Sequence, residues 1–93
     1  MTVDPTIVRE ILNAEDIEGL LKLGAPSDEY SEEARSISSA LRSIAASDVG
    51  EEAMVSIFRE TWSRSFGPIS EEQLDMRAPA FRRASRLILN RVV

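Results

Sequence analysis

The sequence predicts an all-α protein: a compact orthogonal or up-down bundle of four to five helices, forming a single domain over residues 1–93. Apolar residues recur at spacings of three and four along most of the chain, as on the buried side of helices. Glycine, proline and capping residues separate these stretches. No stretch shows the apolar–polar alternation of β-strands. The 93 residues, 43% apolar and 29% charged, have the size and composition of one globular domain.

The first helix is expected to begin at Pro5, because Asp4 can accept a backbone N–H and proline has none to satisfy. A polar stretch over residues 13–16 predicts a hinge to a second short helix that ends at Gly24, a residue suited to a left-handed cap. Pro26 prevents this helix from continuing. The apolar residues of the two helices are Ile7, Val8, Ile11 and Leu12, then Ile17, Leu20, Leu21 and Leu23.

The next predicted helix spans residues 28–46, with Ser27 or Asp28 as its cap. Its apolar residues follow spacings of four and three, which draws one narrow line down the helix. Small Ser38 and Ala40 beside that line would let another helix approach closely. The line consists of Tyr30, Ala34, Ile37, Leu41 and Ile44.

A helix over residues 50–66 has a broader apolar face and is therefore expected to lie at the centre of the bundle. Ser47 or Asp48 can cap its start, and Gly67-Pro68 ends it. That face consists of Ala53, Met54, Ile57, Phe58, Thr61, Trp62 and Phe66.

The last stretch begins at Ser70, where Glu72 and Gln73 complete a pattern resembling a capping box. Two readings remain open. In the first, a short helix is followed by a last helix that opens at Pro79; in the second, one kinked helix spans residues 70–91. The apolar residues are Leu74 and Met76, then Phe81, Ala84, Leu87, Ile88 and Val92.

Charge is divided unevenly along the chain. Residues 1–53 carry twelve acids and four bases, whereas residues 54–93 carry four acids and seven arginines, so the two parts have net charges of −8 and +3. We expect the two parts to pair across the fold. Four arginines around the last helix could instead contact phosphates, but an acidic domain would repel a nucleic acid, so that partner is not expected. They are Arg77, Arg82, Arg83 and Arg86.

The residue inventory argues against several chemistries. The chain has neither histidine nor cysteine, so it lacks the usual base for a serine or cysteine nucleophile and the usual zinc ligands. No catalytic residues, metal ligands or cofactor are therefore assigned, and the protein is expected not to be an enzyme. Trp62 and Phe66, at helical spacing, are read as core residues. The absence of cysteine, of a signal peptide and of a long apolar run predicts a cytoplasmic protein without a membrane segment.

The densest charge feature is the group of acids at the start of the helix predicted over 28–46. Anionic side chains are favourable there, by about 0.3–1 kcal/mol each, because of the helix dipole. Beside a tyrosine that can pack and hydrogen-bond, they also form a candidate surface for a basic protein partner. The alternative is a divalent cation held by two carboxylates. The candidate partner-binding residues are Asp28, Glu29, Tyr30, Glu32 and Glu33.

Two segments carry a family resemblance. Residues 16–20 (Asp-Ile-Glu-Gly-Leu) and 26–33 (Pro-Ser-Asp-Glu-Tyr-Ser-Glu-Glu), followed by Phe66-Gly67, resemble a family of small bacterial helical domains of unknown function. Its pattern has proline where this chain has Ile17. The resemblance covers about residues 7–67 and implies a helical fold and a bacterial origin. By analogy with small acidic immunity proteins that neutralise toxins, it suggests a non-enzymatic interaction module, with a homo-oligomeric structural domain as a further alternative.

Overall fold

The computed structural model describes residues 1–91, which contain four α-helices and one short 3-10 helix but no strand. Along the chain these are α1 (Pro5–Glu15), α2 (Ser31–Arg42), η1 (Ala46–Asp48), α3 (Glu51–Ser65) and α4 (Glu71–Arg91). The predicted all-α bundle is confirmed. Val92, assigned above to the last helix, lies outside the described residues.

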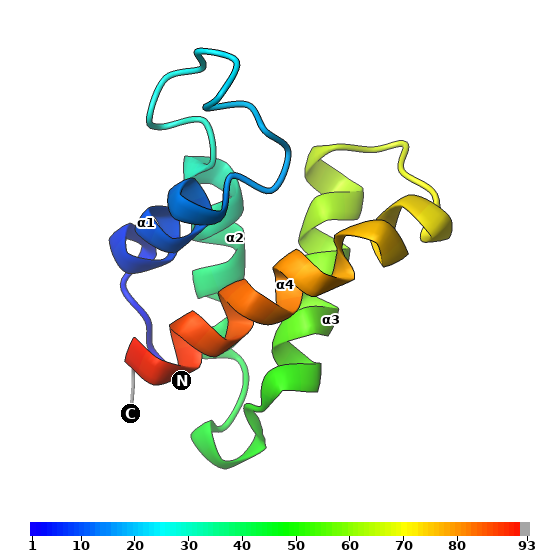
Figure 1. Ribbon diagram of the computed structural model, residues 1–93. Helices are drawn as coiled ribbons and strands as arrows, with labels where there is room; N and C mark the ends of the chain where they lie inside the picture. Colours follow the sequence, from blue (N-terminus) through cyan, green and yellow to red (C-terminus); the bar gives the residue numbers. More distant parts are fainter. Residues whose placement is uncertain (92–93) are drawn as a thin grey trace.

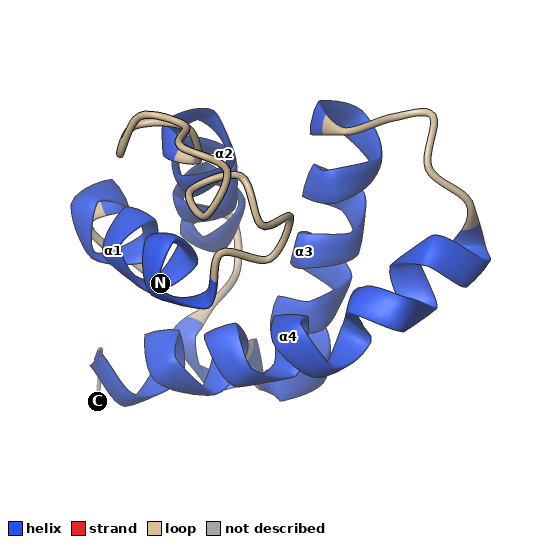
Figure 2. Ribbon diagram, turned by 45° about the horizontal axis from the view of Figure 1, so that its top comes forward, coloured by secondary structure: helices blue, strands red, loops and turns tan. Residues whose placement is uncertain are grey.

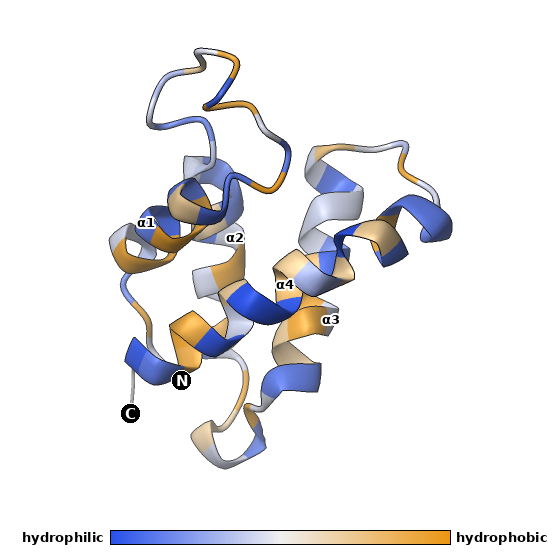
Figure 3. Ribbon diagram, in the orientation of Figure 1, coloured by the Kyte–Doolittle hydropathy of each residue, from blue (hydrophilic) through white to orange (hydrophobic). Residues whose placement is uncertain are grey.

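The four helices pack in a closed ring, in which α2 contacts α1 and α3 while α4 contacts α3 and α1 (Figure 1). Helix α4 crosses α3 steeply instead of running alongside it, which places the bundle nearer the orthogonal arrangement (Figure 2). Each helix carries both hydrophilic and hydrophobic residues, as expected of elements that bury one side (Figure 3).

Helix α1 begins as predicted, with the Asp4 carboxylate accepting the backbone N–H of Thr6 at 2.8 Å. The short helix expected after it is wrong, because Asp16 and Gly19 adopt positive φ angles of 45° and 70° that turn the chain out of helical geometry. Of the predicted helix, only a single turn is present, and it ends at Gly24, whose φ is 98°. There the Ala25 N–H donates to the carbonyl of Leu20, which confirms the predicted left-handed cap.

Helix α2 is shorter than predicted at both ends, because residues 27–30 form turns before it and it ends at Arg42 instead of residue 46. Tyr30 occupies the cap position in place of Ser27 or Asp28, and its side chain makes no capping hydrogen bond. The predicted apolar line is nonetheless buried from Tyr30 to Leu41, and Ile44 is partly buried. The buried Ser38 hydroxyl donates to the carbonyl of Val3, which ties the N-terminal segment to α2.

Helix α3 starts one residue later than predicted, after Gly50, and Ser47 and Asp48 belong to η1 and do not cap it. The helix ends at Ser65. A Cβ atom on Gly67 would lie 2.5 Å from the Ser63 carbonyl oxygen, so this close approach requires glycine.

Helix α4 follows the second of the two readings, because it runs without a break from Glu71 to Arg91 with Pro79 inside it. The capping box at its start is confirmed: the Gln73 N–H donates to Ser70 Oγ at 3.1 Å, and the Ser70 N–H donates to Gln73 Oε1 at 2.9 Å. Pro79 is exposed, so its ring points away from the core while Leu74 and Phe81 on either side are buried.

The core is organised around Trp62, which is fully buried, as predicted for a residue of the central helix. Its ring lies 5.4 Å from that of Phe81, 6.0 Å from Phe58 and 6.3 Å from Tyr30 between centroids. Phe66, partly buried, is 5.2 Å away, so all five aromatic residues of the chain form one cluster. Such pairs add about 0.5–1.5 kcal/mol each beyond the area they bury.

Candidate functional site

The structure divides the predicted acidic residues into an exposed and a buried group. Asp28, Glu29 and Glu32 are exposed at the start of α2. Tyr30 has no exposed surface, and Glu33 is only 5% exposed. The last two therefore cannot contact a partner in this conformation, and we use the name acidic surface for Asp28, Glu29 and Glu32 alone.

Glu33 is buried because it lies three residues after Tyr30 and next to Ala34, on the side of α2 that faces the core. Burial raises the pKa of the Glu33 carboxyl, and the nearby charges of Glu32 and Glu29 raise that pKa further. Glu33 makes no ion pair with any residue between 1 and 91. It is thus a buried acid without a basic counterpart in that part of the chain.

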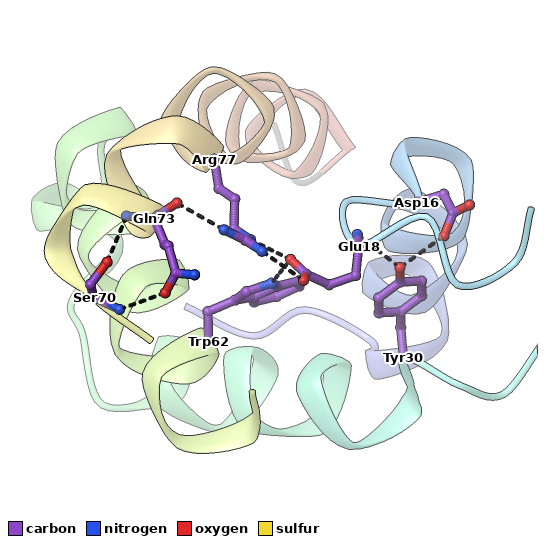
Figure 4. Close-up of polar contacts among 7 residues, drawn as sticks. All are labelled: Asp16, Glu18, Tyr30, Trp62, Ser70, Gln73 and Arg77. Atoms are coloured by element: carbon purple, nitrogen blue, oxygen red, sulfur yellow. Dashed lines mark hydrogen bonds and ion pairs between the residues drawn. The ribbon is translucent and has the colours of Figure 1, made fainter. Parts of the chain in front are cut away.

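Tyr30 anchors the segment that joins α1 to α2 (Figure 4). Its hydroxyl donates to Asp16 Oδ1 at 2.8 Å and accepts the backbone N–H of Glu18 at 3.1 Å. Burial, together with the hydrogen bond to Asp16, raises the pKa of Tyr30 to about 12. The tyrosine is therefore a neutral structural group that connects the core to the loop.

Asp16 organises the same segment from its left-handed position, which aspartate tolerates better than most residues. Its two carboxylate oxygens accept the backbone N–H groups of Leu21 and Lys22, each at 3.1 Å. Burial raises the pKa of Asp16, but the hydrogen bonds from Leu21, Tyr30 and Lys22 outweigh it, and the net effect lowers that pKa. The ionised carboxylate thus holds the single turn after α1.

Glu18 reaches from the loop to the other half of the molecule (Figure 4). Its carboxylate accepts from the indole N–H of Trp62 at 2.9 Å and pairs with Arg77 of α4, whose Nη2 lies 2.9 Å from Glu18 Oε1. The hydrogen bonds from Arg77 lower the pKa of Glu18 against the opposing effect of burial, and the Trp62 bond lowers it further. Arg77 is itself fixed by a bond to the carbonyl of Gln73 at 2.9 Å.

These contacts hold residues 16–30 against α3 and α4 although the segment contains no regular helix. A further tie is the Asn13 side chain, which donates to the carbonyl of Ser27 at 2.9 Å. The acidic surface directly follows this anchored segment, so its carboxylates are held in a defined place on the molecule. The same segment contains Leu23, which is 84% exposed.

The predicted pairing of the acidic and basic parts is confirmed, although the acidic surface takes no part in it. Four arginines of α4 pair with acids elsewhere, among them Arg77 with Glu18, Arg83 with Glu15 at 3.2 Å, and Arg86 with Glu51 at 3.1 Å. Arg82 contacts both Glu51 and Glu52. The four arginines considered for phosphate contacts are thus engaged within the fold.

Sequence reasoning did not identify Asp16, Glu18 and Arg77 as a connected group. The one local signal was the pattern Asp16-Ile17-Glu18-Gly19, in which an acid before a glycine suits a turn that returns to the backbone. The bond from Trp62 to Glu18 joins residues 44 apart and depends on tertiary packing.

Among residues 1–91, no three acidic side chains are grouped so as to hold a metal ion. Within the same residues, no helix combines the length and apolar character needed to cross a membrane.

Comparison with protein-family models, with curated proteins and with solved structures yields no match.

Proposed function

We propose that this protein is a non-enzymatic interaction module that binds a basic protein partner through the acidic surface. The observation that carries the proposal is a contrast between two groups of carboxylates. Asp28, Glu29 and Glu32 are exposed and make no ion pair within the described part of the chain. Other carboxylates, such as those of Glu18 and Glu51, form ion pairs with arginines of α4.

Unpaired carboxylates at a fixed place favour recognition of positive charge. They raise the rate of encounter with a basic surface, and no internal ion pair has to be broken for binding. Leu23, exposed on the preceding segment, supplies an apolar side chain that a partner could bury. The resemblance to small helical bacterial domains, and the analogy with immunity proteins, support a protein as the partner. The lack of cysteine supports the cytoplasm as the compartment.

The test is an affinity pull-down from a lysate of the source organism, at low and at high salt, with wild type and two charge-matched variants. One variant, D28N/E29Q/E32Q, neutralises the acidic surface. The other, E10Q/D48N/E72Q, neutralises three exposed acids elsewhere that also lack ion pairs within residues 1–91. We expect a partner that is retained by wild type at low salt, shed at high salt, lost with the first variant and kept with the second.

A partner retained equally by both variants would contradict the acidic surface as the binding site. If nothing specific is retained, the two remaining hypotheses are tested directly. Light scattering over a dilution series would reveal a homo-oligomer. A rise in melting temperature with millimolar Mg²⁺, Mn²⁺ or Ca²⁺ would indicate a carboxylate metal site, because a ligand that binds the folded state stabilises it.

A further inference from the structure

A polar groove of about 510 Å³ lies between α2 and α3. Its volume falls within the range of about 300–1,000 Å³ typical of small-molecule sites. Helix α2 supplies one wall and α3 the other, which agrees with the packing of these two helices in Figure 1. The polar residues that line it are Arg35, Ser36, Ser39, Ser43, Glu60 and Arg64.

The two arginines of the groove differ from the four paired arginines of α4. Within residues 1–91, neither Arg35 nor Arg64 forms an ion pair or a side-chain hydrogen bond. Glu60 precedes Arg64 by four residues on α3, a spacing that favours an intrahelical pair, yet the two do not pair. Both guanidinium groups therefore keep their donors available for a ligand.

Three serine hydroxyls complete the donors on the α2 side. Ser36, Ser39 and Ser43 follow one another at spacings of three and four, which places them along one side of the helix, and all three line the groove. Each hydroxyl can donate one hydrogen bond and accept others. Opposite them, the carboxylate of Glu60 is an acceptor only.

We propose that this groove is a binding site for a small phosphorylated polyol, such as a sugar phosphate. Two guanidinium groups match the charge of a phosphate monoester, about −2 near neutral pH, and their planar forks fit phosphate oxygens. The serine hydroxyls supply further donors to the same group. The negative charge of Glu60 disfavours a purely anionic ligand, but its carboxylate can accept a hydrogen bond from a sugar hydroxyl. The groove therefore favours a ligand that carries both a phosphate and hydroxyl groups.

A second, smaller cavity shares one of these residues and is the competing location for a phosphate. It has a volume of about 110 Å³ and is lined by Arg9, Arg35, Thr6 and Ser31, with Pro5 and Ala34. Its size suits an inorganic anion better than a sugar phosphate. Arg9 and Arg64 therefore distinguish the two cavities, because each borders only one of them.

The experiment titrates the ¹⁵N-labelled full chain with ribose 5-phosphate, inorganic phosphate or ribose, and follows amide chemical shifts. The variants are R35A, R64A, R9A and E60Q, with R42A as the matched control, since Arg42 is also an exposed arginine of α2 but borders neither cavity. Thermal unfolding of each variant verifies that it is folded.

We expect saturable shifts with ribose 5-phosphate at the amides of the groove and none with ribose. R35A and R64A should each weaken binding by about tenfold or more, whereas R42A and R9A should leave it within about twofold. E60Q should bind inorganic phosphate more tightly but lose part of the preference for ribose 5-phosphate. Absence of saturation at millimolar ligand, or equal losses in R64A and R42A, would overturn the proposal. Dependence on Arg9 instead of Arg64 would move the site to the smaller cavity and overturn it as well.

Discussion

The carboxylate of Glu18 receives both the indole N–H of Trp62 and the guanidinium of Arg77, and thereby joins the loop after α1 to the two C-terminal helices. The side chains of Glu18 and Arg77 are 14% and 25% exposed, so this pair lies in a less solvated environment than a surface salt bridge. The contact fixes a loop without regular secondary structure to α3 and α4.

Glu18→Gln should therefore lower the free energy of unfolding by about 1–3 kcal/mol, because it removes a partly buried ion pair and leaves Arg77 without its counter-charge. Chemical denaturation monitored by Trp62 fluorescence measures the effect. The matched comparison is Glu15→Gln, which breaks the pair with Arg83, whose side chain is 58% exposed. That change should cost less than about 1 kcal/mol. Equal losses for the two variants would show that Glu18 is an ordinary surface ion pair.

The stability of wild type and that of Glu18→Gln should also depend differently on pH. The pKa of Glu18 is lowered in the folded state, by the Arg77 hydrogen bonds above all, so ionised Glu18 contributes stability above its unfolded pKa of about 4.5. That contribution is lost as the pH falls through the folded pKa. Glu18→Gln should thus destabilise the protein at pH 7 and have a smaller effect near pH 3. Unfolding curves at the two pH values test this, and a loss that is independent of pH would contradict it.

Tyr30→Phe isolates the hydroxyl from the ring. The phenylalanine ring keeps the packing against Trp62, while the Glu18 N–H loses its acceptor and Asp16 loses one donor. The expected loss of stability is about 1–2 kcal/mol. Amide hydrogen exchange should accelerate over residues 16–24 more than in α3. Unchanged exchange in that segment would mean that the hydrogen bonds from the Leu21 and Lys22 N–H groups to the Asp16 carboxylate suffice to hold it.

Glu33 should behave in the opposite sense to Glu18. Its pKa is raised by burial, so the proton-bound form is favoured in the folded state. The associated stability is present below the unfolded pKa and is lost as the pH rises through the folded pKa. Glu33→Gln should therefore raise the melting temperature at pH 7 and change it little near pH 3. Glu32→Gln, at the neighbouring exposed position, should have little effect at neutral pH. A lower melting temperature for Glu33→Gln at pH 7 would contradict this sign.

Local patterns were enough to predict much of the fold. The cap at Asp4, the left-handed Gly24, the capping box at Ser70 and the apolar line of α2 depend on neighbouring residues, and each is present in the structure. The loop after α1 was wrongly predicted as a helix because its leucines have helical spacing. Asp16 instead leaves α1 with a positive φ, and its carboxylate accepts a hydrogen bond from the hydroxyl of Tyr30, 14 residues away, which no local pattern specifies.

The candidate site was predictable only in part for the same reason. The acids at the start of α2 were evident as a charge cluster, but which of them are exposed depends on the cap position. With the cap at Tyr30, the tyrosine and Glu33 turn toward the core, and only three acids remain accessible. The groove between α2 and α3 joins Arg35 to Arg64 across two helices, so it could not be read from either segment alone.

Pro79 offers the most direct test of α4 as one helix. A proline within a helix lacks the N–H that would bond to the carbonyl four residues earlier, here that of Asp75, and costs about 3 kcal/mol relative to alanine. If α4 is continuous in solution, Pro79→Ala restores that bond at an exposed position and should raise the free energy of unfolding by about 1–3 kcal/mol. Denaturant titration measures the change, with Pro26→Ala, exposed and outside any helix, as the control for loss of proline rigidity. Two helices meeting at Pro79 would instead make that proline a favourable first residue, and Pro79→Ala would then be neutral or destabilising.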